Sequence, residues 1–155
     1  MKKIFTFIVL AGLFASCSIN SPEPEITDET EAYEALGTLL IPSSGFTKEN
    51  LLTKVVLVDQ EKLDIYMFDV KFAALMPVTI DMVISGVPYV QNGSLITFYG
   101  DSIVPYAGNK PYEKYIVTEL EGSITADSMF ISNNYGDTPD IYRGALKQSI
   151  TKAFF

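Results

Sequence analysis

One stretch near the middle of the chain decides the fold: Val78-Thr79-Ile80-Asp81-Met82-Val83-Ile84-Ser85. Its even positions are all apolar, whereas Thr79, Asp81 and Ser85 point to the opposite side. Alternation with a period of two is typical of a β-strand that buries one face and exposes the other. The stretch therefore predicts a strand with one face in a core.

A tight turn follows this strand. Asn92-Gly93 separates it from a second alternating run, Leu95-Ile96-Thr97-Phe98-Tyr99. A two-residue Asn-Gly loop supplies the positive φ angles that a type I′ turn requires. We therefore expect the two strands to pair as an antiparallel hairpin.

The same pattern extends over the rest of the chain, where β-branched and aromatic runs alternate with turn-forming residues. Within 62–72 the polar residues change face, which predicts a β-bulge near residues 66–68, of the kind that bends a strand in a barrel. The sequence thus predicts an all-β fold of about eight strands, at 33–41, 53–59, 62–72, 77–87, 94–100, 113–126, 129–134 and 140–146.

Several short strand and turn signatures recur along the chain: Gly37-Thr38-Leu39, Met76-Pro77-Val78-Thr79-Ile80-Asp81, Ser85-Gly86-Val87-Pro88, Gly100-Asp101-Ser102-Ile103-Val104-Pro105, Leu120-Glu121-Gly122 and Tyr142-Arg143-Gly144. Together they resemble the calycin-like β-barrel domain of small Gram-negative lipoproteins. The resemblance covers residues 33–146 and implies an eight-stranded antiparallel meander that closes into a lipocalin-like barrel. It implies no reaction, because the function of that family is largely unassigned. We expect the barrel domain to span 33–155.

The chain begins with a segment typical of export. Lys2 and Lys3 precede an apolar run at 4–14, which is too short for a membrane-spanning helix of about 20 residues. The run closes on Leu13-Phe14-Ala15-Ser16-Cys17, which resembles a bacterial lipobox with Phe14 in place of the usual Leu. We expect a signal peptide at 1–16 and acyl chains such as palmitate on Cys17. A plain signal peptide with an incidental Cys is the alternative.

Residues 17–32 are acidic and contain Pro22 and Pro24, as expected of a flexible linker that begins at the lipidated Cys17. These features predict a lipid-anchored protein of the cell envelope, at the outer membrane, with the membrane as its partner through Cys17. Whether it faces the periplasm or the cell surface stays open, as does its oligomeric state.

The composition excludes several classes of function. The formal net charge is -8, and removal of Lys2 and Lys3 brings it to -10, which argues against binding to nucleic acid. The chain has no His, and its single Cys leaves the domain without a disulfide. Because imidazole chemistry is excluded, we predict no enzymatic activity, no catalytic residue, no cofactor and no metal.

Three local patterns carry weaker hypotheses. Glu119 and Glu121 share one strand face and could act as paired carboxylates, but an exposed acidic face is the favoured interpretation. The stretch 133–140 is rich in oxygen ligands and could hold Ca²⁺, although its spacing favours a turn. Ser102 and Ser128 each follow an Asp and precede an apolar residue, a short pattern that resembles an O-glycosylation acceptor.

An eight-stranded barrel has room either for packed side chains or for one small ligand. The first hypothesis is a binding module for a small apolar ligand or an envelope partner, and the second is a packed structural barrel. We favour a mostly filled interior with a narrow mouth, and we expect neither an inward charge nor any aromatic side chain besides Phe98. The side chains expected to line it are Val78, Ile80, Met82, Ile84, Ile96, Phe98, Ile116, Leu120 and Ile124.

Overall fold

The computed structural model describes residues 31–147, so the predicted signal peptide, Cys17 and most of the linker and tail lie outside the described residues. Eight strands form the main body: β1 (Ala32–Ile41), β2 (Phe46–Leu57), β3 (Lys62–Val70), β4 (Ile80–Asn92), β5 (Leu95–Gly100), β8 (Val117–Ile124), β9 (Ser128–Tyr135) and β10 (Thr138–Leu146). The connection between β5 and β8 contains the short strands β6 (Tyr106–Ala107) and β7 (Lys110–Pro111) and the 3-10 turn η1 (Glu113–Tyr115). The predicted all-β fold is confirmed.

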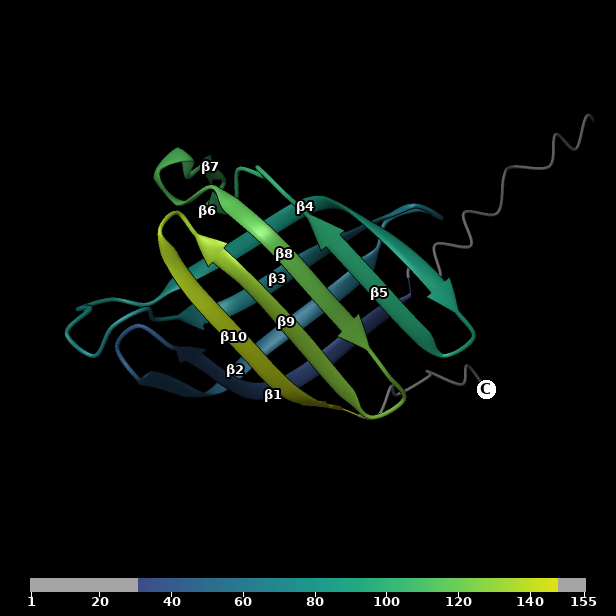
Figure 1. Ribbon diagram of the computed structural model, residues 1–155, viewed down its shortest axis with the longest axis horizontal. Coiled ribbons are helices and arrows are strands. Elements are labelled where there is room, and N and C mark those ends of the chain that lie inside the picture. The colour runs from purple at the N-terminus through teal and green to yellow at the C-terminus, as the bar shows by residue number, and fades with distance from the viewer. Residues whose placement is uncertain (1–30, 148–155) are drawn as a thin grey trace, which may run out of the picture.

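The eight strands close into a barrel. Each pairs antiparallel with its neighbour in the order β1-β2-β3-β4-β5-β8-β9-β10, and β10 pairs with β1 (Figure 1). The β6–β7 hairpin adds to β4 beside this ring. The predicted eight-stranded antiparallel barrel is therefore confirmed, and it is consistent with a calycin-like barrel.

One face of each strand points into the barrel and forms the core. In β4 the expected alternation holds, with Met82 and Ile84 buried while Asp81 and Ser85 are exposed. Opposite Phe98 in β5 the chain has Gly122, where any Cβ would overlap the phenylalanine ring. The interior is thus packed so closely that the Phe98 ring requires glycine at the position opposite it.

Four irregularities in the strand pairing bend the wall: one between β1 and β2, where Asn50 has φ +54°, two between β3 and β4, and one between β8 and β9. The shift in β3 lies between Met67 and Val70 and places Asp69 at φ +56°, slightly beyond the predicted site at 66–68. In the three irregularities outside the β1–β2 pair, the backbone N–H of a residue with positive φ donates to an aspartate of a neighbouring segment: Asp69 to Asp81 at 2.9 Å, Gly86 to Asp64 at 2.8 Å and Glu119 to Asp101 at 3.2 Å. These three bulges therefore each have a side-chain acceptor for the displaced N–H.

The predicted hairpin is confirmed, but its turn lies one residue further along. Asn92 pairs with Leu95, so Gly93 and Ser94 are the central residues, and only Gly93 has positive φ, +63°. This arrangement matches a type II′ turn, which needs glycine at its first central position only. A turn with positive φ at both central residues occurs instead between β6 and β7, at Gly108 and Asn109.

The two ends of the barrel are built differently. We call the end where β1 begins and β10 ends the terminal end; its connections are the short turns 58–61, 93–94 and 125–127. The opposite loop end, at the left of Figure 1, carries 42–45, 71–79, 101–116 and 136–137. Among residues 31–147 no helix has the length and apolar character to cross a membrane.

Candidate functional site

The stretch 133–140 is not a single turn, contrary to the sequence prediction. Only Gly136 and Asp137 form the turn between β9 and β10, with Gly136 at φ +59°. Because one glycine suffices for this two-residue turn, the pairing continues on both sides of it and sets Asn133 opposite Asp140. The alternation in β9 and β10 then directs both side chains into the barrel.

Asp140 and Asn133 form a polar cluster in the interior. Asp140 is 0% exposed and Asn133 is 3% exposed. None of the four side-chain oxygen and nitrogen atoms of these two residues has a hydrogen-bond partner among residues 31–147. The expectation that no residue of a charged type faces the interior is therefore wrong, because Asp140 does. The reason is that oxygen-rich strand residues were interpreted as a turn.

Burial controls the ionisation of this cluster. Removal from water raises the pKa of the Asp140 carboxyl well above its ordinary value, because the charged form loses its hydration. Tyr135 is also inside, and burial and then the charge of Asp140 raise its pKa. Both effects favour neutral side chains in the free protein. The hydroxyl of Tyr135 donates to the sulfur of Met67, at 3.4 Å, and the neighbouring Asn133 side chain acts on the pKa of Tyr135 in the opposite direction, lowering it.

Two further polar side chains lie inside the wall beside this cluster. The hydroxyl of Tyr142 shares its hydrogen between the carbonyl oxygens of Ala35, at 3.0 Å, and Leu51, at 3.3 Å, so its donor is used while its oxygen can still accept. Thr53 is fully buried opposite Met67 and its Oγ1 has no partner within the described chain. Thr53 thus adds a hydroxyl to the interior that can both donate and accept. The side chains predicted to line the interior included neither Thr53 nor the interior tyrosines.

Aromatic rings connect the polar cluster to the loop end. Tyr112 stacks on Tyr115 with centroids 5.0 Å apart, Tyr115 stacks on Phe72 at 6.2 Å, and Phe72 meets Tyr135 edge-on at 5.1 Å. We call these four rings the aromatic stack. It runs from the exposed Tyr112 to the buried Tyr135. Phe72 belongs to the loop 71–79, in which Leu75 is 95% exposed.

Some of the side chains that were expected to line the interior are buried, and others are not. Ile80 is half-buried. Val78 is 60% exposed and Ile116 is 37% exposed, so the predicted inward orientation of Val78 and Ile116 is wrong. Val78 precedes the start of β4, and the bulge at Glu119 shifts the alternation so that Val117 is buried in place of Ile116. The remaining six are buried in the core: Met82, Ile84, Ile96, Phe98, Leu120 and Ile124.

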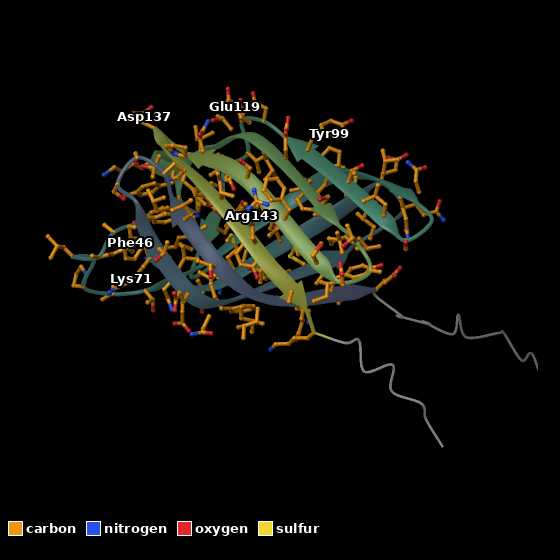
Figure 2. All side chains as sticks on the ribbon, turned by 60° about the horizontal axis from the view of Figure 1, so that its bottom comes forward. Phe46, Lys71, Tyr99, Glu119, Asp137 and Arg143 are labelled. Carbon is orange, nitrogen blue, oxygen red and sulfur yellow. The ribbon has the colours of Figure 1, made fainter. Side chains whose placement is uncertain are left out.

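The acidic side chains of β8 lie outside the barrel. Glu119 and Glu121 are exposed, and Glu119 Oε2 accepts from Asn134 Nδ2 at 2.8 Å. Together with Tyr99 they line an open groove of about 870 Å³. Figure 2 shows Tyr99 and Glu119 on the outer surface. A second open hollow of about 660 Å³ lies at the terminal end.

The outer surface of the described chain provides no candidate metal site. Residues 31–147 contain no group of three or more His, Cys, Asp or Glu placed to hold a metal ion. Ser102 and Ser128 are both exposed, and O-glycosylation at these two residues stays a prediction from the sequence. Neither outer hollow is lined by a buried polar side chain that lacks a partner. The polar cluster around Asp140 is therefore the candidate site.

Comparisons with protein-family models, with curated proteins and with solved structures find no match for this chain. The functional argument therefore depends on the residues themselves. One sequence signal could have located the cluster: the alternation of Met129, Ile131, Asn133 and Tyr135 continues with a period of two beyond residue 131. Following it would have placed Asn133 inside.

Proposed function

We propose that the protein is a lipid-anchored barrel of the cell envelope that binds a small molecule beside Asp140 and Asn133. One observation carries the binding proposal: the closed barrel holds five buried side-chain atoms without partners, on Thr53, Asn133 and Asp140. A buried polar atom without a hydrogen bond costs about 1 to 3 kcal/mol. Five such atoms would together approach the whole stability of a typical domain, about 5 to 15 kcal/mol. A bound molecule that supplies the missing hydrogen bonds removes this cost.

Entry at the loop end fits this proposal. Phe72 separates the polar cluster from the exposed rings, and its loop, 71–79, has one internal backbone hydrogen bond, from Met76 N to Ala73 O at 3.2 Å. A loop with few buried contacts opens at low cost in free energy. Displacement of Phe72 would expose Tyr135 and the interior behind it. The loop 71–79 therefore serves as the gate in this proposal.

The proposed anchor attaches at the opposite end of the barrel. Cys17 precedes β1, and β1 begins at the terminal end. A linker of this composition would hold the terminal end toward the membrane and leave the gate facing away from it. This arrangement supports an outer-membrane lipoprotein that collects a solute from the surrounding compartment. We infer no catalysis, because the sequence has no His to transfer protons near neutral pH.

The anchor is tested by Cys17→Ser in the full-length chain. We expect the wild-type protein to fractionate with membranes and to incorporate a palmitate label, and the variant to be released. Continued membrane association of Cys17→Ser, with no label in the wild type, would contradict the anchor. This result leaves the binding proposal untouched, because binding depends on the barrel alone.

The binding proposal is tested by calorimetric titration of the full-length chain, extracted in detergent, with probes of four chemistries: dodecanoate, glucose, butan-1-ol and butylammonium. We expect saturable 1:1 binding of at least one probe, and its loss in Met82→Trp. Met82 pairs with Met67, which accepts the Tyr135 hydroxyl, so tryptophan there would obstruct the site. Urea unfolding checks that the variant is folded.

A packed barrel without a ligand is the second candidate. It is favoured by the 21 apolar or aromatic side chains that are buried in the described chain, none more than 2% exposed. In this alternative the polar cluster is satisfied by internal water, and the protein acts through its outer surface. Failure of all four probes to bind would establish this alternative over the binding module.

A further inference from the structure

The unpartnered atoms of the polar cluster are mainly acceptors. Four of the five are oxygens, two on Asp140 and one each on Asn133 and Thr53, and the remaining atom is the Asn133 amide nitrogen. A carboxylate and an amide oxygen can only accept, so a partner must bring several donors. Ligands whose polar atoms are all acceptors fit this cluster poorly.

The charge of the buried residues narrows the range of ligands that fit the cluster. Asp140 is the only ionisable carboxylate among the buried residues of the described chain, and no Lys or Arg is buried with it. A single positive charge would balance it. A divalent metal ion fits less well, because the described residues provide no group of three metal-ligating side chains.

The surroundings also suit an organic cation. Tyr135 separates the cluster from Phe72, and the aromatic stack continues to Tyr115. Ring faces attract ammonium groups, most strongly where water is excluded. The sulfur of Met67 lies beside the Tyr135 hydroxyl and adds a soft, polarisable wall.

We propose that the ligand is a small primary ammonium ion, whose three N–H groups donate to the Asp140 carboxylate and to Asn133 Oδ1. This inference rests on the proposed binding function and specifies its ligand class. Asn133 Nδ2 remains available to donate to a hydroxyl or carbonyl elsewhere on the same ligand. The charge-assisted bond to Asp140 provides the selection against uncharged analogues.

Binding is then linked to proton release. In the free protein, burial favours the protonated Asp140 carboxyl, whereas a bound ammonium favours the carboxylate. The affinity should therefore rise with pH up to the pKa of Asp140 in the free protein and level off above it. The interior groups that could contribute are Tyr135 and Tyr142, and burial raises the pKa of both, which keeps them neutral.

The test compares butylammonium with butan-1-ol, which has the same carbon chain and no charge. Both are titrated calorimetrically into the full-length wild type, Asp140→Asn and the control Glu121→Gln. Glu121→Gln makes the same carboxyl-to-amide change on the exposed outer face of β8, so it controls for the substitution itself. We expect butylammonium to bind the wild type and Glu121→Gln equally, and Asp140→Asn roughly 10- to 150-fold more weakly. Butan-1-ol should bind all three weakly.

A measurement on the wild type alone keeps the inference testable if Asp140→Asn does not fold. Titrations in two buffers with different ionisation enthalpies report the protons released, and we expect a fractional release that vanishes at high pH. The side-chain amide resonances of Asn133 should shift on addition of butylammonium.

The outcomes separate this inference from the binding function. Equal affinities for butylammonium and butan-1-ol, or saturable binding of Ca²⁺ in place of the amine, would overturn the ammonium assignment and leave a binding barrel. Undiminished butylammonium binding in Asp140→Asn would also overturn it. No binding of any probe to the wild type would overturn both proposals.

Discussion

The two sides of the barrel interior have the same backbone pairing and opposite chemistry. The apolar wall, β4, β5 and β8, directs Met82, Ile84, Ile96, Phe98, Leu120 and Ile124 inward. The polar wall, β9 and β10, directs Asn133, Tyr135, Asp140 and Tyr142 inward toward the loop end, beyond the apolar Met129 and Ile131 of β9. Burial of apolar area stabilises the first wall, whereas unpartnered polar atoms destabilise the second. The barrel thus separates the residues that hold it together from those that we propose recognise a ligand.

The largest effect is expected in the apolar wall. Phe98→Ala removes a ring that packs over Gly122, and we expect a loss of about 3 to 5 kcal/mol in the free energy of unfolding. The neighbouring Tyr99→Ala removes an exposed side chain and should cost less than about 0.5 kcal/mol. Urea unfolding measures both. Similar losses in the two variants would show that this wall is not a packed core.

Substitution of the buried carboxyl in the polar wall should instead raise the free energy of unfolding. The pKa of Asp140 is raised in the folded state, so above the unfolded-state pKa of about 3.9 the folded protein holds a proton that the unfolded chain has released. Stability contributed by this proton is complete below that pKa and is lost as the pH rises toward the folded-state pKa. Asp140→Asn should therefore stabilise the ligand-free protein at pH 7 relative to the wild type, because the amide keeps no proton that the unfolded chain would release.

Urea unfolding between pH 4 and pH 8 measures this difference. The stability of the wild type should decline with pH relative to that of Asp140→Asn. Parallel pH profiles for the two proteins would mean that Asp140 is not desolvated, and the contrast between the walls would disappear.

A smaller effect distinguishes the turns of the two walls. Gly93 joins β4 to β5 and Gly136 joins β9 to β10, both with positive φ. Gly93→Ala has open space and should cost about 1 kcal/mol from backbone strain alone. Gly136→Ala should cost more, because its Cβ would lie 3.1 Å from the carbonyl oxygen of Lys114. Equal losses on thermal unfolding would contradict this packing of Lys114 against the polar wall.

The smallest effect is expected at the gate. Leu75→Ser changes a side chain that is 95% exposed, and the free energy of unfolding should stay within about 0.5 kcal/mol of the wild type. A larger loss in urea would mean that Leu75 packs against the molecule in solution. The gate would then be closed more firmly than its few hydrogen bonds indicate.

The apolar wall was predictable from the sequence because its strands alternate in the ordinary way. The polar wall was missed, because Asn, Gly, Asp and Pro favour turns by their local chemistry, and this outweighed the period-two alternation that continues to Tyr135. The pairing of Asn133 with Asp140 shows that these residues continue two strands. Ile116 was misassigned for a different reason. A bulge at Glu119 inserts a residue, and a strict period of two cannot anticipate where the chain takes positive φ.

The hydroxyl of Tyr142 has a consequence for how the chain reaches this structure. It bonds to the carbonyls of Ala35 and Leu51, which lie 107 and 91 positions away in the chain. Contacts of such long sequence separation form slowly, because a long loop must close before they are gained. During synthesis β1 can pair with β2 early, but its other edge waits for β10. For that interval the nascent chain presents an open strand edge to which a second chain can add, and the arrival of Tyr142 ends this exposure to aggregation.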